Sequence, residues 1–273
     1  MSSGDPQTQP PARITGLRRR RFATPRTITA LMLREMSTRY GASPGGYAWA
    51  IAEPLGMIII LGAAFSLVLR TPSLGSSFLL FYATGFLPFN LYQSLNGMIM
   101  RAIWFSRPLL GYPAVTWMDA LLARFILNSL TAILVSYILL VGIMIVTETR
   151  TVLDMGPIVL SMALAMLLGL GTGALNCLLI GLFPVWEHVW SIAMRPMFLI
   201  SAVFFIVEDL PPFTQNLLWY NPLVHISGLM RMGFYPMYSP GYISVTYVVS
   251  VALITMALGF VLLARYHQDI LNR

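Results

Sequence analysis

The chain has 273 residues, of which 57% are hydrophobic and only 10% charged. Its formal net charge of +7 results from 17 basic residues, all of them arginine, and 10 acidic ones. Such a composition, with a mean hydropathy of +0.75, excludes a soluble globular protein and indicates a chain surrounded largely by lipid. The missing lysine excludes a P-loop and Schiff-base chemistry, and the single cysteine, Cys177, excludes an intramolecular disulfide and a Cys-rich metal site.

The first 40 residues divide into a basic tail and an amphipathic segment. Residues 1–26 are rich in Pro, Gln, Thr and Arg and lack apolar periodicity, which predicts a disordered basic tail in the cytoplasm. Residues 27–40 carry apolar side chains at steps of four with polar ones on the opposite side, which is typical of an amphipathic helix. A place along the cytoplasmic membrane surface and a place against the helix bundle both fit this pattern.

Six apolar stretches follow that are long enough to cross a hydrocarbon layer of roughly 30 Å. They cover about 48–69, 78–99, 120–146, 157–183, 189–207 and 243–264. The interval 208–242 contains five prolines, which predicts two short re-entrant or surface helices instead of a span. We therefore predict an all-α membrane protein with six transmembrane helices, an N-terminal amphipathic helix, and short re-entrant helices between spans five and six.

The arginines predict the orientation of the chain in the membrane. Thirteen of the 17 fall in the N-terminal segment, the 101–124 region and the polar C-terminal end, 265–273. The loops on the other side hold only Arg70, Arg150 and Arg231. By the positive-inside rule both termini are cytoplasmic, which requires an even number of spans and agrees with six.

A long loop, 101–118, connects the second and third predicted spans on the cytoplasmic side. Loops that only connect helices are usually shorter. The loop is either a docking element, with Leu110 and Tyr112 as apolar contacts and Arg107 as a polar one, or a passive connection. In the passive case Asp119 merely caps the third helix.

Three stretches carry a family resemblance, in the order REMSTRYGASPGGYAWAIAEPLG, RPLLGYPAVTWMDALLARF and WYNPLVHISGLMRMGFYPMY. Together they resemble the permease subunit of ABC-2 type exporters over nearly the whole chain from about residue 27. Within that family the chain looks most like the capsular polysaccharide exporters of Gram-negative bacteria. The run LL-x-YP-x-V, followed by Asp119 and Arg124, is the part most specific to this branch.

The resemblance implies a bacterial inner-membrane homodimer bound to two separately encoded ATP-binding subunits. Those subunits would hold ATP and Mg²⁺, so this chain would bind no cofactor, and the cargo would be a lipid-linked polysaccharide moved outward. It implies an ABC-2 type transmembrane domain over 27–264, with 27–40 as interface helix, 101–118 as coupling element and 208–242 as periplasmic helices above the pore. A periplasmic or outer-membrane export complex is a further candidate partner; nucleic acid is not.

A polysaccharide path needs aromatic faces, polar groups and, for acidic glycans, positive charge. Aromatic and amide side chains recur at helical spacing in the second predicted span, namely Tyr82, Phe86, Phe89 and Gln93. They form either a stripe on the path or an ordinary lipid-facing or interfacial set. Glu53 and Arg195 are charges within or bordering spans, which either contact the substrate or snorkel to the interface.

Glu187 and His188 lie between two tryptophans in a predicted cytoplasmic turn. They either contact the ATP-binding subunit or belong to a tryptophan anchor at the membrane interface. They form no metal site, because the remaining histidines, His225 and His267, fall in other segments.

The leading hypothesis is therefore a non-enzymatic permease subunit for capsular or related lipid-linked polysaccharide. Within transport, the alternatives are an ABC-2 exporter of O-antigen or of small amphipathic molecules. An alternative from another class is a membrane-embedded enzyme acting on lipid-linked sugars. That enzyme would need clustered carboxylates, whereas Glu53, Asp119, Glu187 and Asp269 are scattered among segments.

Overall fold

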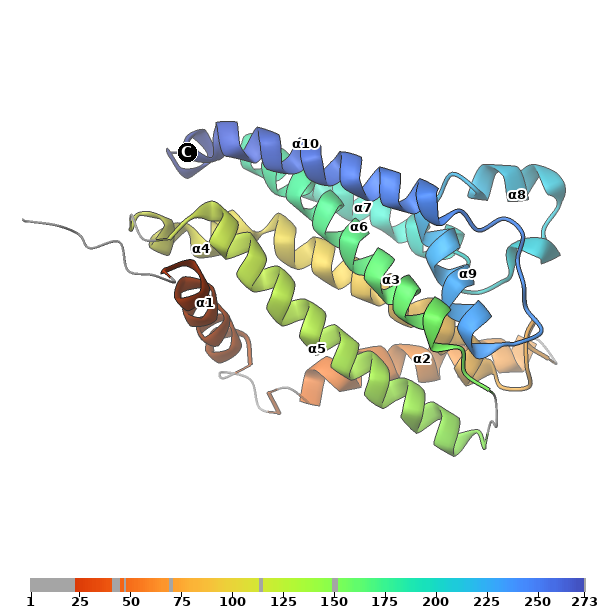
Figure 1. Ribbon diagram of the computed structural model, residues 1–273. Helices are drawn as coiled ribbons and strands as arrows, with labels where there is room; N and C mark the ends of the chain where they lie inside the picture. Colours follow the sequence, from red (N-terminus) through yellow and green to blue (C-terminus); the bar gives the residue numbers. More distant parts are fainter. Residues whose placement is uncertain are drawn as a thin grey trace, which may run out of the picture.

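The computed structural model describes residues 23–40, 45–46, 48–68, 71–112, 115–148 and 152–272, which form helices and turns (Figure 1). The helices in chain order are α1 (Ala23–Tyr40), α2 (Ala48–Val68), α3 (Phe78–Met100), α4 (Ala102–Leu110), α5 (Trp117–Val146), α6 (Met155–Leu182), α7 (Trp186–Ile200), the 3-10 turn η1 (Val207–Asp209), α8 (Pro212–Leu218), α9 (Pro222–Phe234) and α10 (Val245–Asn272). The predicted tail lies outside these residues except for 23–26, which form the first turn of α1.

Four helices in the described part of the chain, α2, α5, α6 and α10, are long and apolar enough to cross a membrane. α3 is 23 residues long but carries amide side chains in its second half, which lower its hydropathy. α7 has only 15 residues, fewer than the about 20 that a bilayer requires. The all-helical fold is confirmed, and four spans are supported by length and composition alone.

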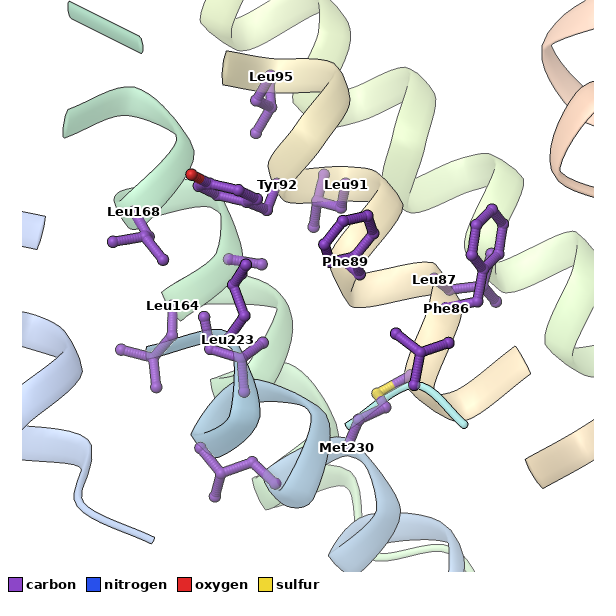
Figure 2. Close-up of a cluster of buried hydrophobic side chains, with 14 of the residues drawn as sticks. Phe86, Leu87, Phe89, Leu91, Tyr92, Leu95, Leu164, Leu168, Leu223 and Met230 are labelled. Atoms are coloured by element: carbon purple, nitrogen blue, oxygen red, sulfur yellow. The ribbon is translucent and has the colours of Figure 1, made fainter. Parts of the chain in front are cut away.

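α3 is the central helix of the bundle and packs against α2, α5, α6 and α9. Its buried face is a run of large apolar side chains that meets Leu164 and Leu168 of α6 and Leu223 and Met230 of α9 (Figure 2). Because these neighbours cover much of α3, its amide Asn96 is only 2% exposed and lies within the protein.

α6 packs closely against α10 through glycines. A Cβ at Gly171 would lie 2.5 Å from the carbonyl oxygen of Ala252, and one at Gly259 would lie 2.7 Å from the backbone nitrogen of Leu175. Small residues let membrane helices approach to backbone contact, where van der Waals packing stabilises them. These two glycines therefore fix the distance between the two helices.

The fifth predicted span, 189–207, differs from the observed helix, which ends at Ile200. Ala202 has a φ of 54°, in the left-handed region, and the chain turns there. Polar side chains of the α9 segment take up the carbonyls freed by this turn: Asn221 donates to Ile200, Ser227 to Ser201, and Arg231 to Val203 and Phe205. Irregular backbone at membrane depth is stable only where protein satisfies it in this way.

The two ends of the bundle differ in character. α1, α4 and the C-terminal end of α10 lie at one end, and α8 and α9 lie at the other (Figure 1). Between α4 and α5, Thr116 and Asp119 form a capping box, with the Thr116 hydroxyl accepting from the Asp119 backbone at 3.2 Å. Asp119 therefore caps α5.

Candidate functional site

A polar cavity of about 310 Å³ lies between α2, α3 and α5. α3 contributes residues at helical spacing, namely Asn90, Gln93, Ser94 and Gly97, and Arg101 follows directly after the helix. α5 faces them with Asn128, Thr131 and Ser136, and α2 adds Glu53. We call this the central cavity. Polar groups within membrane helices are costly, and two facing stripes of them are typical of a hydrated path.

A second cavity, of about 430 Å³, adjoins the first at Gln93 and extends to α7. Arg195 of α7 and Phe86 of α3 line it, together with Met57 of α2. A third, of about 510 Å³, shares Arg101 with the central cavity and reaches α4 and the α6–α7 turn. The three cavities follow α3 along much of its length, and we call them together the α3 groove.

The α3 groove brings together four of the residues predicted for a path, namely Glu53, Phe86, Gln93 and Arg195. The three polar ones, Glu53, Gln93 and Arg195, come from three different helices and have exposed side chains, and Gln93 lines both adjoining cavities. A carboxylate, an amide and a guanidinium in one groove provide both hydrogen-bond donors and acceptors. Such a set suits a ligand rich in hydroxyl groups.

The predicted aromatic stripe is divided by the fold. Tyr82 and Phe89 are each 1% exposed and lie away from the groove. Tyr82 packs edge-on against Phe204 at 5.5 Å between ring centroids, and Phe89 packs against Phe198 at 5.2 Å. Phe86 alone among the stripe's aromatics lines a cavity, so in the single chain the other two are core residues.

The residues predicted to contact an ATP-binding subunit all lie near one end of the bundle. Tyr112, just after α4, is 64% exposed, whereas Leu110 is partly buried against the core. Arg107 donates from Nη2 to the backbone oxygen of Leu271 at 2.9 Å, which joins α4 to the end of α10. Tyr112 is therefore the most accessible of the three.

The other predicted contact pair has separate surroundings. Glu187 forms an ion pair with Arg101 at 2.7 Å, which links the start of α7 to the end of α3. His188, its neighbour, is exposed. Of the two, His188 is the side chain presented outward.

The two tryptophans that flank this pair make hydrogen bonds to buried amides. The indole nitrogen of Trp186 donates to Oδ1 of Asn176 at 2.9 Å, and that of Trp190 donates to Oδ1 of Asn96 at 3.0 Å. Both asparagines are 2% exposed and lie within apolar helices. An isolated asparagine in an apolar run was the sequence signal for this network, because a buried amide requires a partner.

A second feature that the sequence reading missed joins α1 to α5. Glu35 and Arg124 form an ion pair at 3.4 Å, and their side chains are 4% and 7% exposed.

Among the residues that the structure describes, no group of three or more His, Cys, Asp or Glu side chains is placed to hold a metal ion.

The comparison with known proteins decides the family. A profile of the ABC-2 type transporter family matches residues 26–235, more than half of the chain. The chain belongs to the ABC-2 type transporter family. This ABC-2 permease is 30% identical over 236 residues to the polysialic acid transport protein KpsM of Escherichia coli, covering 86% of this chain and 92% of KpsM.

Two further relatives of the permease are inner-membrane proteins of capsule polysaccharide export. It is 24% identical over 245 residues to CtrC of Neisseria meningitidis serogroup A, covering 90% of this chain and 92% of CtrC. It is 22% identical over 245 residues to BexB of Haemophilus influenzae, with the same coverage of 90% and 92%. The resemblance to the capsule branch is thereby confirmed, and the chain is a multi-pass inner-membrane permease subunit, not an enzyme.

Proposed function

We propose that this permease is the transmembrane subunit of an exporter that moves lipid-linked capsular polysaccharide across the bacterial inner membrane. The α3 groove carries the proposal, because Glu53, Gln93 and Arg195 line adjoining cavities, the first of them polar, between the apolar helices of the bundle. Amides, hydroxyls and charged groups of both signs match the hydroxyls and acidic groups of a glycan. The relatives named for capsule polysaccharide export and polysialic acid transport support the same substrate class.

In this proposal six helices cross the membrane, with both termini in the cytoplasm. Besides α2, α5, α6 and α10, a further span is α3, which its neighbouring helices shield from lipid. The remaining one is α7 together with the turn that follows it. α8 and α9 are then the short periplasmic re-entrant helices. The gathering of α1, α4 and the end of α10 at one end supports this topology (Figure 1).

The working unit is a homodimer that binds two ATP-binding subunits. Those subunits hold ATP and Mg²⁺, since this chain has no lysine for a P-loop. α4 is the coupling helix, with Tyr112 and His188 as contacts. An outer-membrane export complex is the expected partner on the periplasmic side, where α8 exposes Phe213 and Leu217 at 81% and 65%.

Deletion of this permease in its bacterium, followed by staining of surface glycan, tests the proposal. Loss of capsule, with restoration by the plasmid-borne wild-type chain, is the expected result. Retention of capsule with loss of O-antigen or of drug resistance would identify one of the other ABC-2 exporters. Turnover of lipid-linked sugar by the purified chain alone would identify an enzyme.

A further inference from the structure

The guanidinium of Arg124 lies where four helices meet. Arg124 belongs to α5, and its Nε lies 3.4 Å from Oε2 of Glu35 on α1. Nη1 donates to the backbone oxygen of Met98 on α3 at 2.7 Å. The central carbon of the guanidinium, Cζ, lies 4.1 Å from the ring centroid of Phe105 on α4. A single side chain of α5 therefore contacts the interface helix α1, the coupling helix α4 and the central helix α3.

The contact with Met98 concerns the joint between α3 and α4. The last four carbonyls of a helix have no partner within it, and Met98 lies in the last turn of α3. α4 begins at Ala102, with one residue between the two helices. Arg124 thus donates to the Met98 carbonyl at the end of α3 while its guanidinium stacks on Phe105 in the first turn of α4. These two contacts fix the angle between α3 and α4.

The contact with Glu35 fixes α1 to the bundle. Glu35 is 3% exposed, and Nδ2 of Asn128, one turn beyond Arg124, lies 3.5 Å from its Oε1. Removing one partner of a buried ion pair leaves a charge without compensation, which is strongly destabilising locally. Arg34, the residue before Glu35, also approaches the Phe105 ring, at 5.3 Å. α1 and α4 are therefore joined through the same small group of side chains.

We propose that Arg124 is the positioning residue that makes α1 and α4 move as one unit and transmits their movement to the α3 groove. The inference rests on the proposed function, because it needs an ATP-binding subunit that displaces α4. Met98 lies beside Arg124 and also lines the central cavity, so a change at the joint reaches the groove directly. A cavity of about 230 Å³ bordered by Glu35, Phe105 and Arg124 gives these side chains room to exchange partners.

The geometry requires arginine in particular. A guanidinium presents several donors in a planar fork and stacks on aromatic rings, whereas a lysine ammonium is a compact point charge. Arg124→Lys keeps the positive charge beside Glu35 but cannot reach Met98 and stack on Phe105 at once. Glu35→Gln removes the charge that holds α1 and leaves the other two Arg124 contacts in place.

The test uses the permease reconstituted with its ATP-binding subunit and measures glycan exported per ATP hydrolysed. We expect Arg124→Lys and Glu35→Gln to lower this ratio about tenfold, within the usual range of coupling free energies. Binding of the ATP-binding subunit and its hydrolysis rate remain near wild type. Arg265→Gln is the matched control, since Arg265 is an exposed arginine at the cytoplasmic end of α10, and it leaves the ratio unchanged.

The outcomes separate this inference from the function beneath it. A wild-type complex that exports no glycan contradicts the proposed function itself. If the wild-type complex exports glycan normally and both variants export the same amount of glycan per ATP hydrolysed, the role of Arg124 is overturned and the proposed function stands. Loss of the ATP-binding subunit from both variants also overturns it, because that result assigns the cluster to docking. If one of the two variants does not fold, the other decides the question.

Discussion

The indole nitrogen of Trp190 lies 3.0 Å from Oδ1 of Asn96, and this hydrogen bond ties the short helix α7 to the central helix α3. Nδ2 of Asn96 in turn donates to the Thr172 hydroxyl of α6 at 2.7 Å. Three helices are thereby joined by one asparagine side chain that is 2% exposed. In the proposed transporter, this network holds the start of α7 at the edge of the α3 groove.

Trp190→Phe should lower the stability of the permease by about 1 kcal/mol, the usual net value of one buried hydrogen bond. The measurement is thermal unfolding in detergent, followed by a thiol-reactive dye. Cys177, the only cysteine in the chain, is 1% exposed and reports unfolding. Trp104→Phe is the control, because Trp104 is 43% exposed. Equal melting temperatures for both variants would count against the network.

Gly171→Val should lower stability by about 1 to 3 kcal/mol, because overpacking forces the helices apart. The added atoms would meet the α10 backbone, where even a Cβ lies 2.5 Å from the Ala252 oxygen. Gly142→Val on α5 is the matched control, since a Cβ at Gly142 meets nothing within 4 Å. The thiol-reactive dye assay compares the melting temperatures of the two variants. A Gly171→Val variant that melts at the wild-type temperature would refute the close packing of α6 against α10.

Acid should destabilise the end of the bundle that holds α8 and α9, through His225 of α9. Burial lowers the pKa of this imidazole, an effect that hydrogen bonds with the Trp219 and Tyr242 backbone partly oppose. Nδ1 accepts from the Ser244 backbone at 3.2 Å, and protonation would remove that acceptor. Since the unfolded chain takes up a proton near pH 6.5 and the folded chain only at lower pH, stability falls as the pH drops below about 6.5.

Melting curves between pH 8 and pH 5 measure this effect, with His225→Gln as the comparison. The wild type loses stability on the acid side, and the variant loses less over the same interval. A wild type that becomes more stable as the pH falls would show that His225 is not held in its neutral form.

Gln93→Leu should lower glycan export about fivefold, the equivalent of one lost hydrogen bond of about 1 kcal/mol to the substrate. Gln93 lines both the central cavity and the cavity beside Arg195. Because the Gln93 side chain is exposed, its replacement should leave the fold intact, so a lower export rate would report on substrate contact in the groove. Gln268→Leu, the same change at an exposed site on α10, serves as control. Export at the wild-type rate from the Gln93 variant would place the path elsewhere.

Tyr112→Glu should reduce export about tenfold, the effect of losing one of the few aromatic anchors that each contribute more than about 1 kcal/mol to an interface. Tyr112 is 64% exposed, so the folded permease tolerates the charge. Leu110 is the less informative site, because it packs partly against the core. Surface capsule and retention of the ATP-binding subunit are measured together. Normal capsule with the subunit retained would remove Tyr112 from the coupling surface.

The local features of the fold were predictable from sequence because their causes are local. Apolar runs of about 20 residues indicated α2, α3, α5, α6 and α10, and the proline-rich interval indicated that short helices separate the last two spans. The end of α7 was not predictable in this way. It depends on carbonyls that side chains of the α9 segment satisfy, among them Asn221 and Arg231, more than 20 residues further along the chain.

The candidate site was predictable only in part. Glu53 and Arg195 stood out as charges within or bordering apolar spans, and Phe86 and Gln93 as members of a stripe at helical spacing. The fold places these four residues along one groove. Glu35 and Arg124 are 89 positions apart, and their pairing requires α1 to fold back onto α5. A single sequence carries no periodic signal for such a contact.

ATP-driven transfer of labelled lipid-linked glycan in proteoliposomes tests the central claim most directly. The permease together with its ATP-binding subunit should move glycan across the bilayer only when ATP is present, and the permease alone should neither hydrolyse ATP nor move glycan. Hydrolysis of ATP by the isolated chain, or a complete complex that hydrolyses ATP and leaves the glycan in place, would contradict the account.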